Sequence, residues 1–182
     1  MTEEELTALL LGRFSRDFVS RVARLVRLEA AFGTLYALAT GAHAHLPSDR
    51  RHKLLFRSAW VADTLYFETP ELLRPYAERF CATDFPACTD PSARRHFSKI
   101  MAHLLGSYLP PRDVLDRIAE AAAEWALDPE AKVAVRIGAV EVLGRCRDRI
   151  PWVRDAWDDL LAALENEATP GISSRLRNSW RR

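Results

Sequence analysis

Three prolines recur at an almost constant spacing and constrain the fold of this chain more than any other feature. Pro70, Pro111 and Pro151 stand 41 and 40 residues apart, and each precedes a segment whose apolar residues have helical spacing. Proline suits the first position of a helix, because its φ already fits and its missing N–H would have no partner there. Punctuation with a period of about 40 residues is typical of stacked helix pairs, so the sequence predicts a helical repeat protein.

A second marker has nearly the same period. Arginines stand in the first half of alternate predicted helices, at intervals of 38, 41 and 39 residues: Arg57, Arg95, Arg136 and Arg175. No stretch alternates apolar and polar residues with a period of two, so we expect no β-sheet. The sequence therefore predicts an all-α solenoid of about ten helices.

We expect one repeat domain over residues 1–182. Its predicted parts are N-terminal capping helices in 1–28 and helix pairs in 29–68, 70–108, 111–149 and 151–182. Each pair has an apolar face that it cannot bury alone, so neighbouring pairs are expected to stack and to be stable only together.

One of these predicted helices resembles the second helix of a HEAT repeat. The segment contains, in order, an aspartate, a Val-Arg pair, an alanine three residues later and a Leu-Gly pair: Asp128, Val135, Arg136, Ala139, Leu143 and Gly144. Weaker copies surround Arg57 and Arg95, and residues 48–180 are similar to short bacterial proteins of the HEAT and armadillo type. This resemblance implies a right-handed α-α superhelix whose second helices line the concave side, and usually protein binding.

Composition excludes several classes of function. The 26 basic and 25 acidic residues give a net charge of +1, which does not indicate nucleic acid or membrane as a partner. Cys81, Cys88 and Cys146 form no C-x-x-C pair and are expected to be free thiols in a reducing, cytoplasmic environment. The first residues are acidic, unlike a secretory signal, and the longest uncharged apolar run is too short to span a bilayer.

Charge differs between the two predicted helix layers. The segments assigned to the concave layer sum to +10, and those assigned to the convex layer sum to −6. A groove lined by one sign of charge attracts partners of the opposite sign. The sequence therefore predicts a basic concave groove for an acidic partner.

The predicted contact residues lie on three of the concave helices. They are Arg94, Arg95, His96 and Lys99 at the centre, Arg57 and Arg136 on either side, and Trp60 as an aromatic anchor. Arginine and aromatic side chains dominate the binding energy of many interfaces. The repeated arginines Arg57 and Arg136 have a second interpretation, because such residues also tie one repeat to the next.

Asp63 suggests an alternative function. It lies one helical turn from Trp60 and Phe67, and a carboxylate among aromatic rings needs a compensating cation. One interpretation is a structural pair with an arginine of the next repeat. The other follows from HEAT-like DNA glycosylases, which use a tryptophan and an aspartate over a basic surface: Trp60 would stack on a displaced base and Asp63 would stabilise positive charge on the sugar.

The sequence has no other catalytic signature. It contains no G-x-S-x-G motif and no phosphate-binding glycine loop, and His43 and His45 lack a third ligand at fixed spacing. We expect neither a metal nor a cofactor. The preferred function is a non-catalytic binding or scaffold module that holds an acidic protein segment, and the alternative is nucleic-acid binding with possible base excision.

Overall fold

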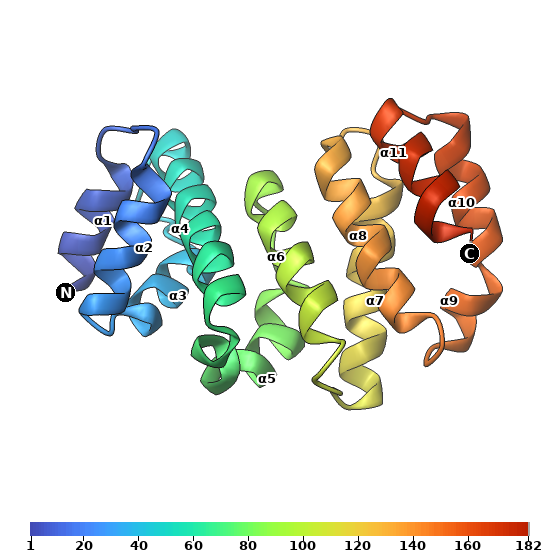
Figure 1. The fold of residues 1–182 in the computed structure, drawn as a ribbon, viewed down its shortest axis with the longest axis horizontal. Coiled ribbons are helices and arrows are strands. Elements are labelled where there is room, and N and C mark those ends of the chain that lie inside the picture. The colour runs from blue at the N-terminus through green and yellow to red at the C-terminus, as the bar shows by residue number, and fades with distance from the viewer. Residues whose placement is uncertain (182) are drawn as a thin grey trace. The chain divides into compact units, whose positions relative to one another are not determined.

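A computed structural model describes residues 1–181, and all regular secondary structure in this range is helical. This confirms the all-α prediction. The α-helices are α1 (Glu3–Leu11), α2 (Phe18–Leu28), α3 (Phe32–Thr40), α4 (Ser48–Glu68), α5 (Ala77–Arg79), α6 (Pro91–Leu104), α7 (Arg112–Leu127), α8 (Val133–Cys146), α9 (Pro151–Asp155), α10 (Trp157–Asn166) and α11 (Pro170–Arg175), as Figure 1 shows. A 3-10 helix (Pro70–Tyr76) and two π-helical segments (Phe80–Asp84 and Leu176–Trp180) complete the regular structure.

The chain forms two compact units. Unit 1 consists of Met1–Ala77 and Cys88–Ile100, and unit 2 consists of Glu78–Ala87 and Met101–Arg182. The predicted division into four helix pairs is not tested by this grouping and stays a prediction.

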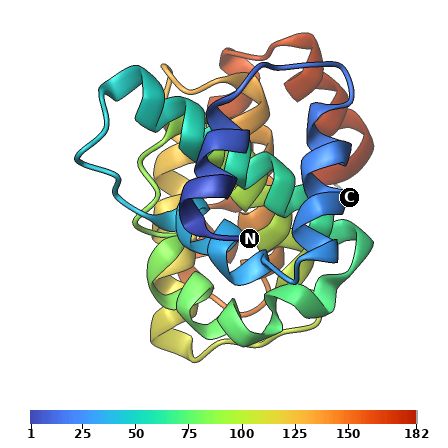
Figure 2. The same cartoon turned by 90° about the vertical axis from the view of Figure 1, so that its left-hand side faces the viewer.

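The long helix α4 is the centre of unit 1. Helices α1, α2 and α3 all pack against it (Figure 2). Its buried apolar residues include Leu54, Val61 and Leu65 along one side of the helix, and Ala59 and Tyr66 roughly a third of a turn away from them. The sequence predicts this arrangement, because the apolar arc of this segment is too wide for a helix with only one covered side.

Unit 2 is built around α7 and α8, which pack closely together. Trp125 of α7 is almost completely buried, and its ring centroid lies 4.7 Å from that of Phe85. Together with the buried residues of α8, these rings form the core of the unit.

The two Asp-Pro sequences behave differently. The Asp90 carboxylate Oδ1 accepts hydrogen bonds from the backbone N–H groups of Ser92 and Ala93, at 3.0 and 2.8 Å, so it caps the N-terminus of α6. The same Asp-Pro pattern at Asp128 would also suggest the start of a helix, but no helix begins there. The Asp128 Oδ1 atom accepts the Glu130 N–H within a turn, and α8 begins only after Lys132, whose backbone is extended.

The prolines start helices at only some of the predicted positions. Pro151 and Pro170 each occupy the first turn of an α-helix, whereas Pro111 immediately precedes α7. Pro70 opens a 3-10 helix, which corrects the prediction of an α-helix there. The reason is Pro75: it has no N–H to bond to the carbonyl four residues earlier, so a regular α-helix cannot continue through it.

The cysteines are free thiols, as predicted. Burial raises the pKa of each of Cys81, Cys88 and Cys146 to about 12. Among residues 1–181, no helix combines the length and the apolar character needed to cross a membrane.

We expect the folded protein to react at least about 100-fold more slowly than the unfolded chain with a thiol reagent at pH 8, because only the thiolate is the nucleophile and burial removes most of it. Absorbance during reaction with Ellman's reagent, with and without denaturing guanidinium, measures this ratio. A thiol that reacts equally fast in the folded and the unfolded chain would contradict the burial of the three cysteines. Loss of this fast reaction in the Cys88→Ser variant would assign it to the half-buried Cys88.

Candidate functional site

Asp63 is the buried charge around which the predicted site residues of unit 1 gather. It lies on α4 and is 3% exposed. Its Oδ2 atom accepts hydrogen bonds from His96 Nδ1 at 2.8 Å and from Lys99 Nζ at 2.6 Å. These two donors are three residues apart on α6 and therefore share one face of that helix. The cation that compensates Asp63 is thus a lysine, with a histidine beside it, and not the arginine that the sequence suggested.

The two oxygens of Asp63 have unequal partners. Whereas Oδ2 accepts both hydrogen bonds, Oδ1 is buried without a hydrogen-bond partner among the described residues. Buried carboxylate oxygens are normally hydrogen-bonded, because an isolated charge is costly to remove from water. The bonds from His96 and Lys99 therefore carry the compensation of this charge.

Trp60 lies in a stack of rings at the surface of unit 1. Its centroid is 6.1 Å from that of Phe14, 5.5 Å from that of Phe56 and 6.0 Å from that of His96. Trp60 is half-buried and Phe14 is 48% exposed, so the stack reaches solvent. His96 is buried beside the rings of Phe56 and Trp60 on α4, and its Nδ1 atom faces Asp63.

The basic residues of α6 divide into internal and exposed side chains. Arg94 Nε donates to the Cys88 carbonyl at 2.9 Å. Arg95 is exposed and makes no ion pair within residues 1–181. The Lys99 side chain is 51% exposed, and its Nζ lies 5.2 Å from the ring centroid of Phe67, which is a cation–π distance. Arg95 and Lys99 are one turn apart, so they share the exposed row of α6.

Arg57 is enclosed within unit 1. Its Nη1 donates to the carbonyls of Leu10 and Gly12, both at 2.8 Å, and its guanidinium lies over the rings of Phe14 and Phe18. Burial lowers the pKa of the Arg57 guanidinium. These bonds fasten the C-terminal end of α1 to α4.

Arg136 has the same kind of environment in unit 2. Its Nε donates to the Ala126 carbonyl in the last turn of α7 at 3.0 Å, and its Nη2 pairs with Glu167 at 3.1 Å. The side chain is buried. These contacts fit the interpretation of Arg57 and Arg136 as structural residues. Of the other two periodic arginines, Arg95 and Arg175 are both exposed, and Arg175 pairs with Glu141 at 3.3 Å.

We define the α4–α6 surface of unit 1 by its exposed and half-buried side chains: Phe14, Phe56, Trp60, Phe67, Arg95 and Lys99. The acidic residues next to it are already engaged. Asp90 bonds to His52 at 2.6 Å and to the start of α6, and Glu68 pairs with Arg27. The surface is therefore cationic and aromatic.

Sequence reasoning missed Phe14, Phe56 and Phe67 as members of this surface. Phe14 stands in the polar segment Arg13-Phe14-Ser15-Arg16, between two helices. A large aromatic residue in such a loop is a signal that could have identified Phe14, whereas Phe67 stands on a helix with many buried apolar residues and gives no such signal.

The described residues hold no group of three or more histidine, cysteine, aspartate or glutamate side chains placed to bind a metal ion. His43 Nε2 lies 2.8 Å from the Leu38 carbonyl, which is a local contact at the end of α3. Comparisons of the chain with family models, curated proteins and solved structures gave no match, so the HEAT-like identity stays a prediction.

Proposed function

We propose that the protein is a non-catalytic binding module and that its α4–α6 surface holds an acidic protein segment. The observation that carries this proposal is the exposed pair Arg95 and Lys99, on a helix without any acidic residue, next to the exposed rings of Phe14 and Phe67. Phe67 is 46% exposed, which is unusual for a ring of this size.

The chemistry of this surface suits a carboxylate-rich segment with some apolar side chains. Arginine binds a carboxylate through two parallel N–H donors, and aromatic rings supply apolar contact area with little loss of conformational entropy. Because Asp63, Asp90 and Glu68 are engaged within unit 1, they do not compete for Arg95.

The alternative functions have less support. A glycosylase-like role needs the Asp63 carboxylate to reach a sugar, but Asp63 is buried and its Oδ2 already accepts two hydrogen bonds. Duplex DNA binding commonly uses about 6 to 10 phosphate contacts, and on the α4–α6 surface the cations are Arg95 and Lys99. Nucleic acid is therefore an outcome that the experiment below distinguishes.

We also propose the finer architecture, a right-handed HEAT-like superhelix. Its support is the recurring role of the periodic arginines: Arg57 binds carbonyls at the end of α1, and Arg136 binds a carbonyl in the last turn of α7. A repeated side chain with a repeated contact is what stacked helical repeats require.

Arg95→Ala is expected to weaken binding of a fluorescein-labelled acidic peptide by about 5- to 30-fold, the effect of losing about 1 to 2 kcal/mol at an interface arginine. Fluorescence anisotropy at low and moderate salt measures the affinity. The matched control is Arg24→Ala, because Arg24 is an exposed arginine on α2 and not on the α4–α6 surface.

Equal affinities of wild type and Arg95→Ala for the peptide would place the site elsewhere. A labelled DNA duplex that binds more tightly than the peptide, and loses affinity in the same variant, would assign the surface to nucleic acid. Binding that responds equally to Arg95→Ala and Arg24→Ala would indicate only nonspecific attraction.

A further inference from the structure

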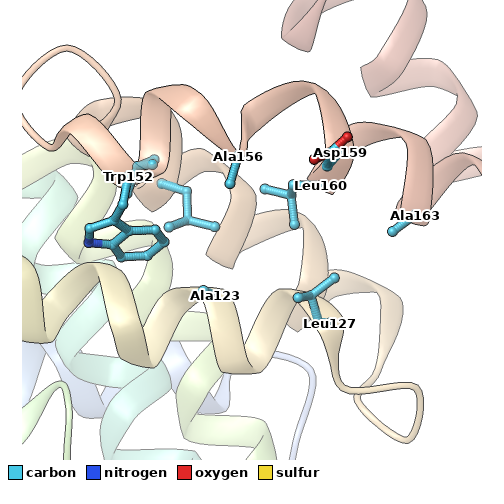
Figure 3. Close-up of a pocket in the computed structure, with 9 residues that line it drawn as sticks. Ala123, Leu127, Trp152, Ala156, Asp159, Leu160 and Ala163 are labelled. Carbon is cyan, nitrogen blue, oxygen red and sulfur yellow. The ribbon is translucent and has the colours of Figure 1, made fainter.

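Unit 2 contains an apolar cavity that the function proposed above does not use. Its volume is about 240 Å³, and it lies between α7 on one side and α9 and α10 on the other (Figure 3). Its walls include Leu127, Trp152, Ala156, Leu160 and Ala163. We call this feature the α7–α10 groove.

The α7–α10 groove exposes large apolar side chains to solvent. Leu127 is 51% exposed and Trp152 is 39% exposed, and the Trp152 indole extends from α9 toward α7 (Figure 3). A tryptophan and a leucine on opposite walls of one cavity form a contiguous apolar surface, unlike single exposed apolar residues scattered over a protein. Contiguous surfaces of this kind mark interaction sites.

Acidic side chains surround the groove. Asp159, on α10, is the charged residue among those that line it. Glu120 and Glu124 are exposed on α7 beside Ala123 and Leu127. The basic residue Arg154 on α9 is paired with Asp155 at 3.4 Å. An occupant must therefore combine an apolar part with positive charge.

The shape of the groove narrows the choice further. Pockets for drug-sized ligands are usually about 300 to 1,000 Å³, so a smaller cavity is better matched to one or two apolar side chains. Helices form its opposite walls, α7 on one side and α9 with α10 on the other, and a groove between helices can receive the apolar stripe of a further helix. We propose that the α7–α10 groove binds a basic amphipathic helical segment of a partner protein, with an apolar side chain in the cavity and lysine or arginine side chains against Asp159 and Glu124.

This second site is independent of the α4–α6 surface. It lies in the other unit, shares no residue with that surface and has the opposite charge. Failure of one proposal therefore leaves the other intact.

The test uses a fluorescein-labelled helical peptide of about 14 residues, made of leucine and lysine with leucine at helical spacing. Fluorescence anisotropy with the full chain is expected to show saturable binding. Asp159→Lys should weaken it by at least 10-fold, and so should Ala163→Phe, which fills the cavity from an exposed position. Far-UV circular dichroism and the urea midpoint check that both variants fold.

Asp158→Lys is the matched control for charge. Asp158 is exposed in the same first turn of α10 as Asp159, but it does not line the cavity. Its replacement by lysine changes the net charge by the same amount. We expect the affinity of the Asp158→Lys variant for the leucine-lysine peptide to stay within threefold of that of the wild type. The peptide controls are a scrambled leucine-lysine sequence without an apolar stripe and a leucine-glutamate version with the stripe, and neither should bind.

Several results would overturn the proposal. Equal weakening by Asp158→Lys and Asp159→Lys, or equal binding of the scrambled peptide, would mean nonspecific electrostatic attraction. Equal binding of the leucine-glutamate peptide would mean that the acidic rim has no role. If sedimentation velocity shows that the free chain self-associates and that Ala163→Phe abolishes this, the occupant is a second copy of the chain.

Discussion

Replacing Asp63 by alanine is expected to lower the free energy of unfolding by about 2 to 3 kcal/mol. The change removes the acceptor of both His96 Nδ1 and Lys99 Nζ. Lys99 can turn to water because its side chain is half exposed, but His96 is buried and its N–H would lose its partner. An unsatisfied buried donor costs more than the bond itself contributed, so most of the effect comes from His96.

Urea denaturation followed by circular dichroism measures this loss, and hydrogen exchange shows where it occurs. We expect reduced protection in α4 and in the first part of α6, without change in α10. Lys99→Ala removes the other partner of this interaction and should cost less than Asp63→Ala, because Lys99 is half exposed and the buried Asp63 carboxylate keeps its hydrogen bond from His96. If Lys99→Ala costs as much as Asp63→Ala, the stabilisation comes from the ion pair and not from the buried histidine.

Arg57→Ala is expected to destabilise the protein by about 3 kcal/mol, the sum of two charge-assisted hydrogen bonds and the contacts with two rings. Leu10 and Gly12 would lose the donor to their carbonyls, and Phe14 and Phe18 would lose the guanidinium that covers them. Since these carbonyls lie at the C-terminal end of α1, amide hydrogen exchange should become faster first in α1.

Arg57→Lys separates charge from geometry. Lysine keeps the positive charge but lacks the planar fork of donors, so we expect it to recover less than half of the lost stability. Arg24→Ala, at an exposed position of α2, should change the free energy of unfolding by no more than about 0.5 kcal/mol. Full recovery by Arg57→Lys would contradict the structural role assigned to the guanidinium.

The two proposed sites give the units partners of opposite chemistry. The α4–α6 surface offers Arg95 and Lys99 beside aromatic rings, whereas the α7–α10 groove offers Asp159 beside Leu127 and Trp152. A chain that holds an acidic segment at one unit and a basic helix at the other would be a scaffold.

Local chemistry made the helical class predictable. Helix periodicity and caps depend on residues within about four positions of one another, so they can be recognised in the chain itself. Asp90 and Thr169 are residues of the type that favours the start of a helix, and each accepts a backbone N–H bond immediately before one. The 3-10 helix at Pro70 was also decided locally, by Pro75, and could have been foreseen.

Tertiary structure decided which side chains are available for binding. Arg57, Arg95 and Arg136 occupy similar positions in the predicted repeats, yet only Arg95 among these three is exposed. Whether such an arginine is buried depends on a carbonyl supplied by another helix, and for Arg57 that carbonyl is 47 residues away in sequence. Helical spacing carries no information about such a distant partner.

The same reason applies to Asp63 and to the α7–α10 groove. The sequence by itself determined that Asp63 lies on a largely buried helix and needs a compensating group. Only the packing of α6 against α4 decided that this group is His96 with Lys99, which are 33 and 36 residues away. Likewise, Leu127 and Trp152 are ordinary apolar residues of two helices until packing leaves both exposed beside one cavity, because exposure is a property of neighbouring elements and not of the local chain.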